Sequence, residues 1–385
     1  MRILHTSDWH LGRSFHGFSL EEHTQELLKE LIDTIRTESI DVLLISGDVY
    51  DQAQPRVNTV KMLSQTLETI NALGCAIVIS SGNHDSSIRL GFGTKILERS
   101  EVYMRTSIDN IDQPVIIERD NQKVAIYAIP YLEPRSASAR FEVEPTHAHV
   151  LEYASKQAQK NLQKQQNITA SIMMAHCFVT SAEPSESERN IHVGGLGTVG
   201  AQTFEGFSYT ALGHLHRPQK ITDTIRYSGS LLAYSYSEEK HRKGAWILDI
   251  TDDGALNIQE HHWRTTVNLK TLRGTLHELL NNPEYSAYYE HYCRIYITDT
   301  PRPTGALEQL RQKYQSIAEL HFEPEQRSET EPKTYRERIK KSHDVVATCT
   351  EFFEHVRQNP LTETEKTYVN GIVQQAQREL EAKEG

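Results

Sequence analysis

Five separate apolar runs of the sequence each end in side chains that can bind a metal ion. The side chains at these ends are, in chain order, Asp8, His10, Asp48, Asn83, His84, Asp85, His176, His214 and His216. Carboxylate, amide and imidazole groups in this combination suit a first-row divalent metal ion. One such group at the end of a strand is weak evidence, because chance explains most examples. The recurrence of metal-binding side chains at the ends of five apolar runs indicates one shared site.

The runs have the length and composition of buried strands. Residues 76–79 form an apolar run that is rich in β-branched residues and bounded by glycine, as expected of a strand in a sheet interior. Residues 41–48 form a second such run, which ends in Gly47-Asp48. Apolar residues recur with helical spacing over 20–39 and 57–73. The alternation of strand and helix predicts a layered α/β domain in which helices cover a sheet.

The predicted strands explain how distant residues meet. Ligands of open α/β sheets bind outside the carboxyl ends of the strands. On an extended strand end, positions 8 and 10 also lie on the same face. Seven donors then converge, namely Asp8, His10, Asp48, Asn83, His176, His214 and His216. Seven donors exceed the needs of one ion and match two octahedral-like ions about 3.5–4 Å apart that share one carboxylate.

The segments between these motifs complete the predicted domain. Short apolar runs at 115–117 and 124–129 predict strands of a second sheet stacked on the first, and 134–148 predicts a loop. The polar, glycine-rich segment 181–200 predicts a long loop near the site. Basic and aromatic residues follow the last motif: Arg217, Lys220, Tyr234, Tyr236, His241, Arg242 and Lys243. Such residues contact phosphates and stack on bases, although a solvated hairpin is an equal alternative.

The bulk composition places limits on the class of protein. The chain has 385 residues and a formal net charge of −11, which argues against a free-standing, non-specific nucleic-acid binder. Bound metal ions or a basic partner subunit would weaken that argument. The sequence has no bilayer-spanning apolar run, no signal-peptide pattern and four cysteines without paired spacing. We therefore expect reduced thiols and a cytoplasmic protein.

The C-terminal third predicts separate modules. Short strand-like and helix-like runs over 265–328 predict a small α+β domain. A dimerisation module and a purely structural unit both fit this composition. The remainder, 329–385, opens with a charged linker. Two amphipathic helices then follow, the second opened by Thr362 and Glu365 in a capping-box pattern. Such a helix pair docks onto a partner or packs back onto its own chain.

The motifs resemble those of the calcineurin-like metallophosphoesterase superfamily. The match rests on Asp8-x-His10, Gly47-Asp48, Gly82 to Asp85, His176 and Gly213 to His216, and it covers roughly the first 230 residues. The resemblance implies a two-sheet sandwich flanked by helices over 1–264, with a small α+β capping domain over 265–328 and a C-terminal helix pair.

The resemblance also implies a role for each site residue. One ion would be held by Asp8, His10, Asp48 and His216. A second would be held by Asp48, Asn83, His176 and His214, with Asp48 as the bridge. His84 would be the catalytic histidine and Asp85 its orienting partner. Mn²⁺ is the usual ion of the family, and the ligands also allow Mg²⁺ or Fe²⁺.

Within the superfamily, the opening strand, the GNHDS motif and the ALGHLHRPQ motif resemble nuclease subunits of bacterial DNA repair complexes. This implies a metal-dependent nuclease of repair, recombination and replication. It would be a 3′–5′ exonuclease on duplex ends and an endonuclease on single strands and hairpins. The chain contains no GxxxxGK[ST] phosphate loop, so ATP dependence would come from an ATPase partner that grips the helix pair. Two copies of each subunit would assemble, at the nucleoid.

Two other functions fit the same motifs. The first is a small-substrate metallophosphoesterase, such as a cyclic-nucleotide phosphodiesterase or a protein phosphatase, which would use the same metal-binding residues. The second is an inactive DNA-binding or assembly subunit. The predicted cap and helix pair disfavour the first alternative, and the intact set of donors disfavours the second.

Overall fold

The structure is a computed structural model that describes residues 1–188, 197–324, 345–357 and 360–384. The chain divides into two compact units. The first contains Met1–Leu272, Pro283–Ile295 and Arg311–Leu320, and the second contains Arg273–Asn282, Tyr296–Leu310 and His321–Gly385. The charged linker predicted at the start of 329–385 lies outside the described residues.

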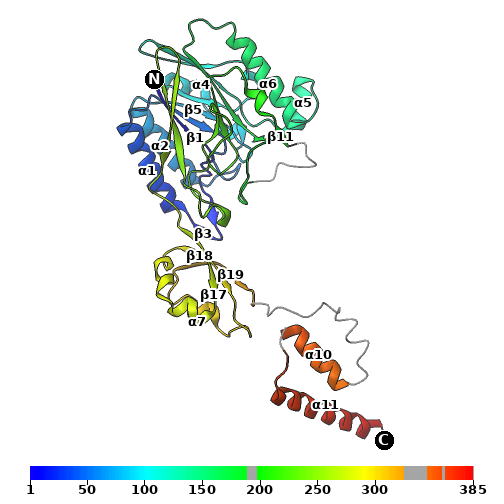
Figure 1. The fold of residues 1–385 in the computed structure, drawn as a ribbon. Coiled ribbons are helices and arrows are strands. Elements are labelled where there is room, and N and C mark those ends of the chain that lie inside the picture. The colour runs from blue at the N-terminus through cyan, green and yellow to red at the C-terminus, as the bar shows by residue number, and fades with distance from the viewer. Residues whose placement is uncertain (189–196, 325–344, 358–359, 385) are drawn as a thin grey trace. The chain divides into compact units, whose positions relative to one another are not determined.

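A six-stranded sheet forms one half of the first unit (Figure 1). Its strands, in spatial order, are β16 (Leu256–His262), β15 (Gly244–Ile250), β1 (Arg2–Thr6), β4 (Val42–Ser46), β5 (Ala76–Ser80) and β6 (Val102–Arg105). Strands β1, β4, β5 and β6 run parallel, and β15 pairs antiparallel to β1. The carboxyl ends of the first three motif-bearing strands therefore lie along one edge.

A second six-stranded sheet carries the other two motifs. Its strands, in spatial order, are β13 (Gln219–Lys220), β14 (Ile225–Tyr227), β12 (Tyr209–Gly213), β9 (Ala170–His176), β8 (Gln122–Ala128) and β7 (Val115–Arg119). The four central strands are parallel, and β13 and β7 are antiparallel edges. The prediction of a second sheet that contains 115–117 and 124–129 is thus confirmed.

Alternation along the strands separates the core into layers. In β4, Val42 and Leu44 face the second sheet and pack with Ile172 and Ala211, whereas Leu43 packs in a different apolar cluster. A strand whose two faces are both covered must be apolar at every position. The continuous apolar runs of the sequence therefore mark strands in the middle layers of a sandwich.

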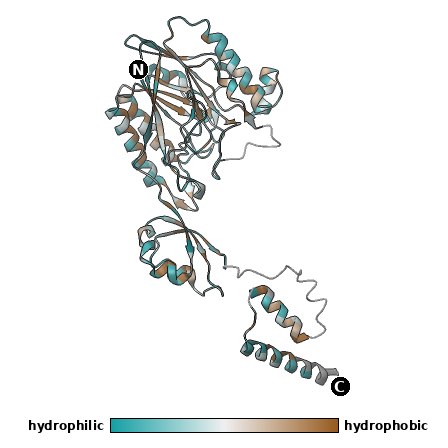
Figure 2. Cartoon of the chain, in the orientation of Figure 1, coloured by the Kyte–Doolittle hydropathy of each residue, from teal (hydrophilic) through white to brown (hydrophobic). Residues whose placement is uncertain are grey.

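Helices cover the outer faces of both sheets (Figure 1). Helices α1 (Glu21–Thr37) and α2 (Val57–Ala72) pack on the first sheet through residues such as Leu27, Leu31 and Ile70. Helices α5 (Pro134–Phe141) and α6 (His147–Leu162) pack on the second. Figure 2 shows brown strands inside and teal outer faces on these helices. The predicted two-sheet sandwich with flanking helices is confirmed.

Helix α5 corrects the prediction of a loop over 134–148. The Glu133 side chain accepts a hydrogen bond from the Ser136 backbone N–H, and Pro134 occupies the first turn of the helix. Both features stabilise a helix N-terminus. Ala137 and Phe141 then anchor the helix in the core, so a proline-containing segment without an obvious apolar stripe becomes helical.

Several short elements connect the layers. They are β2 (Ser14–Phe15), β3 (Phe18–Ser19), α3 (Ser87–Leu90), α4 (Thr94–Leu97), β10 (Phe178–Val179) and β11 (Thr198–Val199). A third sheet has the order β17 (Leu269–Gly274), β18 (Tyr292–Ile297) and β19 (Ser316–Phe322). Helices α7 (Leu276–Asn281) and α8 (Ala306–Leu310) accompany it in sequence. The chain ends with α10 (Val345–Arg357) and α11 (Glu363–Glu384).

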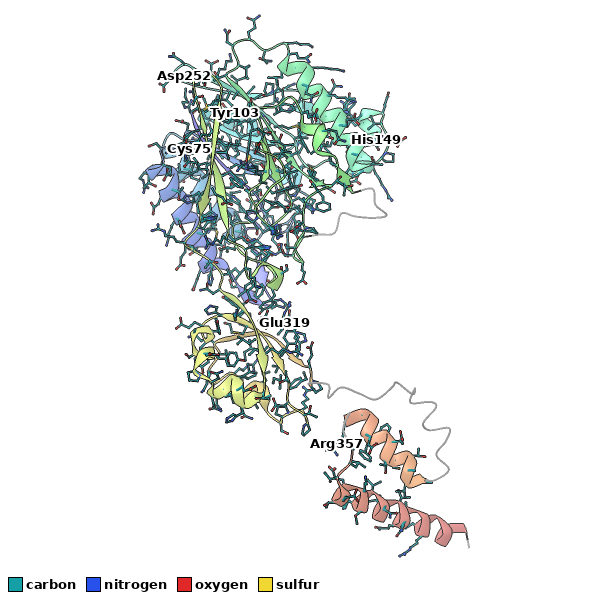
Figure 3. The ribbon with its side chains drawn as sticks, viewed as in Figure 1. Cys75, Tyr103, His149, Asp252, Glu319 and Arg357 are labelled. Atoms are coloured by element: carbon teal, nitrogen blue, oxygen red, sulfur yellow. The ribbon has the colours of Figure 1, made fainter. Side chains whose placement is uncertain are left out.

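All four cysteines are free thiols, as the sequence predicts. Cys75, Cys177 and Cys293 are buried, and Cys349 is half-buried. Cys75 is labelled in Figure 3 beside the first sheet. The three buried thiols therefore serve as small apolar side chains of the interior.

Truncation of the layer between the sheets should destabilise the fold. Leu44 is fully buried between the sheets, so Leu44→Ala removes packed methyl groups and leaves a cavity. We expect the free energy of unfolding to fall by about 2–5 kcal/mol in urea denaturation. Val57→Ala is the control, because Val57 is 70% exposed. Equal effects of the two substitutions would contradict this assignment of the core.

Candidate metal centre

The predicted donors meet where the two sheets come together at their carboxyl ends. The loops after β1 and β4 run side by side, because the backbone N–H groups of Asp8 and His10 donate to the carbonyls of Gly47 and Asp48, each at 3.0 Å. The second sheet joins them through His214, whose backbone N–H lies 3.0 Å from both carboxylate oxygens of Asp8. These contacts bring residues from opposite ends of the sequence into one buried cluster.

Several predicted donors occupy a backbone conformation that side chains usually avoid. Asp8, His10, Asp48 and His214 have φ values of 51°, 44°, 49° and 99°. Non-glycine residues rarely adopt positive φ, and such strain gathers at functional sites. The tight turns that follow the strands thus aim these side chains inward at a cost in backbone energy.

Two of the motif glycines are needed for close approach. A Cβ atom on Gly82 would overlap the carboxylate of Asp48, and one on Gly213 would overlap the backbone carbonyl of Ser46. Ser46 ends β4, and its carbonyl also accepts a hydrogen bond from Nδ1 of His176 at 2.9 Å. Gly213 therefore allows the strand ends of the two sheets to touch, and Gly82 allows the loops after β4 and β5 of the first sheet to approach each other.

The side-chain donors form overlapping groups. Within each of three sets the donor atoms lie within 4.8 Å of one another: Asp8, His10 and His216; His10, Asp48 and His84; Asp8, Asp48 and His176. Asn83 joins the cluster through Oδ1, which lies 3.0 Å from Nε2 of His176 and 3.2 Å from Nδ1 of His214. All seven predicted donors thus lie in one cluster, and Asp48 belongs to two of the three sets.

Burial keeps most of the imidazoles neutral. It lowers the pKa of His10 to about 3 and that of His216 to about 4, and it holds the pKa of His214 well below its usual value. A neutral imidazole carries a free lone pair, which is the form that binds metals.

The buried carboxylates influence each other and His176. Burial raises the pKa of Asp8 to about 8, with His176 acting against the shift and the charge of Asp48 adding to it. Burial alone would lower the pKa of His176, but Asp48 and Asp8 outweigh it and raise that pKa to about 9. Burial would also raise the pKa of Asp48, yet the nearby imidazoles hold it well below its usual range. The two buried carboxylates therefore favour the binding of a positive charge, either a proton or a metal ion.

The orientation of two imidazoles fits a divalent metal ion. Nε2 of His10 and Nε2 of His216 lie 3.0 Å apart. Nδ1 of His10 lies 3.6 Å from the Asp51 carboxylate, and Nδ1 of His216 lies 2.5 Å from Oγ of Ser187. If both Nδ1 atoms carry the proton, the two Nε2 lone pairs face each other, and a shared cation would satisfy both. The oxygen and nitrogen donors of the cluster suit Mn²⁺, Fe²⁺ or Mg²⁺.

His84 lies at the rim of the cluster, and the partner of its Nδ1 differs from our expectation. Nδ1 lies 2.7 Å from the backbone carbonyl of Asp51, and Nε2 lies 3.9 Å from Oδ2 of Asp48. The carboxylate of Asp85 accepts backbone N–H groups of Val49, Tyr50 and Gly82 at 2.9–3.1 Å. Asp85 therefore fixes the loops that carry Asp48 and Asn83, while Asp51 supplies the contact that orients His84.

Sequence reasoning missed a second group of polar residues behind the cluster. Asp51, Ser187, Glu188, Glu238 and Lys243 contact His10 or His216 directly or through one another. Asp51 is only three positions after Asp48, which is the one signal that could have identified it. Ser187 and Glu188 lie in the segment 181–200, which the sequence predicts near the site, and Lys243 was noted as a basic residue near the last motif. Nothing local marks these residues or Glu238 as contacts of His216.

The basic and aromatic residues near the last motif mostly have structural roles. Tyr234, Tyr236 and Lys243 are buried, so they do not present free surfaces for bases or phosphates. Arg217 pairs with Glu183, and Lys220 pairs with Asp223. For Tyr234, Tyr236 and Lys243, burial fits neither alternative that the sequence left open, contact with nucleic acid or a solvated hairpin.

Comparison with known proteins agrees with this geometry. Residues 1–218 match the family described as calcineurin-like phosphoesterase. The chain therefore belongs to the calcineurin-like phosphoesterase family.

Particular relatives carry a more specific name. The chain is 30% identical over 324 residues to the SbcD subunit of the nuclease SbcCD from Staphylococcus epidermidis, and the match covers 83% of this chain and 85% of the relative. It is 30% identical over 328 residues to the protein of the same name from Staphylococcus saprophyticus, covering 83% and 84%. A crystal structure of a dimetal phosphatase from Danio rerio aligns with a TM-score of 0.42 at 11% identity, covering 68% of this chain and 96% of that one.

Among the helices of the described residues, none is both long enough and apolar enough to cross a membrane.

Gly82 offers a test of how tightly the cluster is built. Gly82→Ala places a methyl group against the Asp48 carboxylate, so we expect it to displace Asp48 and weaken Mn²⁺ binding by at least about tenfold, as for other changes that shift a ligand. Isothermal titration calorimetry measures the affinity. Gly371→Ala is the control, because a Cβ there meets no atom within 4 Å. Wild-type affinity in Gly82→Ala would show that this close approach is not required.

Proposed function

We propose that this chain is the nuclease subunit of an SbcCD-type complex, which hydrolyses DNA phosphodiester bonds with two divalent metal ions. The observation that carries the proposal is the buried cluster of carboxylate, amide and imidazole donors at the meeting carboxyl ends of two sheets. The relatives' name adds the nuclease assignment, since the similarity spans 83% of the chain and extends beyond the phosphoesterase domain.

The donors divide between two ions in this proposal. Asp8, His10, Asp48 and His216 would hold one ion, and Asp48, Asn83, His176 and His214 would hold the other. When bound, such ions lower the pKa of a shared water toward neutrality and neutralise the charge of the phosphate. Mn²⁺ is the favoured ion.

His84 would act on the oxygen of the leaving sugar. Its Nδ1 must donate to the Asp51 carbonyl, because a carbonyl oxygen only accepts. A proton given to the leaving group therefore leaves from Nε2 of a doubly protonated ring, and the Asp51 carbonyl keeps that nitrogen facing the cluster. General acid catalysis of this kind contributes about 10²–10⁴-fold to the rate.

The remaining segments would select the substrate and bind the partner subunit. Residues 265–328 would form a capping domain that orients DNA, and 329–385 would bind an SbcC-type ATPase. Support for the second assignment comes from apolar side chains that α10 and α11 leave exposed: Val345, Phe352, Phe353, Val356, Tyr368 and Ile372. In this complex the chain would act at the nucleoid in the cytoplasm. It would be an ATP-dependent 3′–5′ exonuclease on duplex ends and an endonuclease on hairpins and single strands.

Two substitutions separate metal binding from proton donation. Asp48→Ala removes the shared carboxylate, so we expect loss of both Mn²⁺ binding and cleavage of end-labelled duplex and hairpin DNA. His84→Gln should reduce turnover by about 10²–10⁴-fold while the affinity for Mn²⁺ stays within a few-fold of wild type. The readouts are gel-based cleavage and calorimetric titration.

A small phosphodiester assayed in parallel distinguishes the alternatives. Hydrolysis of the small ester without DNA cleavage, even with the SbcC-type partner and ATP present, would favour a small-substrate phosphoesterase. Failure of the wild-type chain to bind metal would favour an inactive assembly subunit. A release of metal by His84→Gln as complete as that by Asp48→Ala would contradict the role given to His84.

We also propose that two copies of the chain pair through α3 and α4. Ile88, Phe92 and Ile96 are 86%, 85% and 73% exposed and recur every four residues. Three large apolar side chains exposed within nine residues of α3, α4 and the turn between them mark an interaction surface, and a second copy would cover it with the same side chains.

The dimer proposal has a simple test. Phe92→Asp should convert a dimer to a monomer in light scattering coupled to size-exclusion chromatography, because a buried charge opposes association. Lys95→Asp changes an exposed neighbour and should leave the dimer intact. A wild-type chain that is monomeric at all accessible concentrations would refute the proposal.

A further inference from the structure

A buried ion pair lies directly behind the cluster, next to His216. The side chains of Glu238 and Lys243 are 0% and 2% exposed and form a salt bridge. Burial of an ion pair is costly unless further hydrogen bonds satisfy both charges. Lys243 Nζ also donates to the His216 carbonyl at 2.7 Å and to Oγ of Ser230 at 2.9 Å. The pair is therefore tied to the backbone of a predicted metal ligand.

The carboxylate of Glu238 is equally well satisfied. Its Oε1 accepts from Oγ of Ser187, from Oγ of Ser235 at 3.0 Å and from the Tyr234 backbone N–H at 3.3 Å. The same oxygen lies 3.9 Å from Nδ1 of His216. Ser187 thus lies between the carboxylate and the imidazole.

The hydroxyl of Ser187 decides which nitrogen of His216 carries the proton. A serine hydroxyl has one proton to donate, and here it goes to Glu238. The oxygen is then an acceptor toward Nδ1 of His216, 2.5 Å away, so Nδ1 must carry the hydrogen. Nε2 is left with its lone pair, directed at the cluster beside Nε2 of His10.

The backbone of His216 is held on its other side as well. Its N–H donates to Oε1 of Glu188 at 2.7 Å, and its carbonyl accepts from Lys243. Glu188 and Ser187 are neighbours in the segment after β10, so one short stretch fixes both the backbone and the ring of His216. Such contacts orient ligating histidines and raise their basicity.

We propose that Ser187, Glu238 and Lys243 form a positioning relay that fixes the tautomer and orientation of His216 for metal binding. This inference rests on the proposed function, because it takes His216 as a metal ligand. The relay residues do not touch the substrate. They act on metal affinity at the ion that His216 would hold, with a smaller effect on the other ion.

The primary test removes one hydroxyl. Ser187→Ala breaks the link between Glu238 and His216 but leaves the buried ion pair in place, and Ser187 is only half-buried, so the variant should fold. We expect Mn²⁺ affinity at one of the two sites to fall about 10–100-fold in calorimetric titration of the full chain. Ser187→Thr retains the hydroxyl and should restore most of the affinity.

A second pair of variants addresses the charge. Glu238→Gln should weaken the same site, and if it fails to fold, Glu238→Gln combined with Lys243→Met removes both buried charges together. Glu239→Gln is the matched control, because Glu239 is the next residue and also pairs with a lysine, Lys270, at 2.8 Å, but it has no contact with His216 in the described residues. It should bind Mn²⁺ as the wild type does.

The outcomes separate this inference from the proposed function. Wild-type affinity at both sites in Ser187→Ala and Glu238→Gln would overturn the relay, whether or not the wild-type chain cuts DNA. Weakened binding in these variants, with DNA cleavage recovered at saturating Mn²⁺, supports the relay. Weakened binding together with a wild-type chain that binds Mn²⁺ but never cuts DNA would support the relay and reject the nuclease.

Discussion

The structure depends on contact between two sheets at their carboxyl ends. One sheet contributes Asp8 and Asp48 and the other contributes His176 and His214, and backbone groups of each hold side chains of the other. The N–H of His214 lies 3.0 Å from both oxygens of Asp8, and the carbonyl of Ser46 accepts from His176. Side-chain donors separated by up to 208 positions, from Asp8 to His216, become neighbours because of this contact. The covering helices and the apolar layers keep the sheets in register.

The same contact concentrates polar groups in a dry environment. Buried carboxylates and imidazoles lose hydration, and the shifted pKa values of Asp8 and His10 reflect that loss. Bound cations would offset this cost, and ligands that bind only the folded state stabilise it. The strained turns at Asp8, His10, Asp48 and His214 fit the same explanation, since strain at several adjacent positions persists only where the surroundings enforce it.

Much of this arrangement can be predicted from the sequence, because strand ends leave strong local signals. Continuous apolar runs that stop at Asp, His or Asn identified all seven predicted donors, and the structure brings them together. Helix α5 was missed, because its stability comes from the Glu133 cap and from two anchors rather than from a regular stripe. The partner of His84 was also missed. The contact is a backbone carbonyl, which every residue has, so the sequence cannot identify it. Asp85 was predicted instead because it is the acidic residue next to His84 in the sequence.

The residues behind the cluster illustrate a more general limit. Ser187 and Glu238 are 51 positions apart and share a hydrogen bond only because the chain folds back. Lys243 and Tyr234 read as surface residues by type, yet both are buried against His216 or His10. Whether such a polar side chain is buried or exposed depends on the hydrogen bonds and ion pairs it forms. Partners that are far away in the sequence cannot be predicted from local composition.

Electron paramagnetic resonance of the chain titrated with Mn²⁺ tests the shared metal site most directly. A shared carboxylate at Asp48 predicts two ions per chain whose spectrum at full loading shows exchange coupling between neighbouring Mn²⁺ centres. A single ion per chain, or two ions whose signals stay uncoupled, would contradict the central claim that the ends of two sheets build one two-metal site.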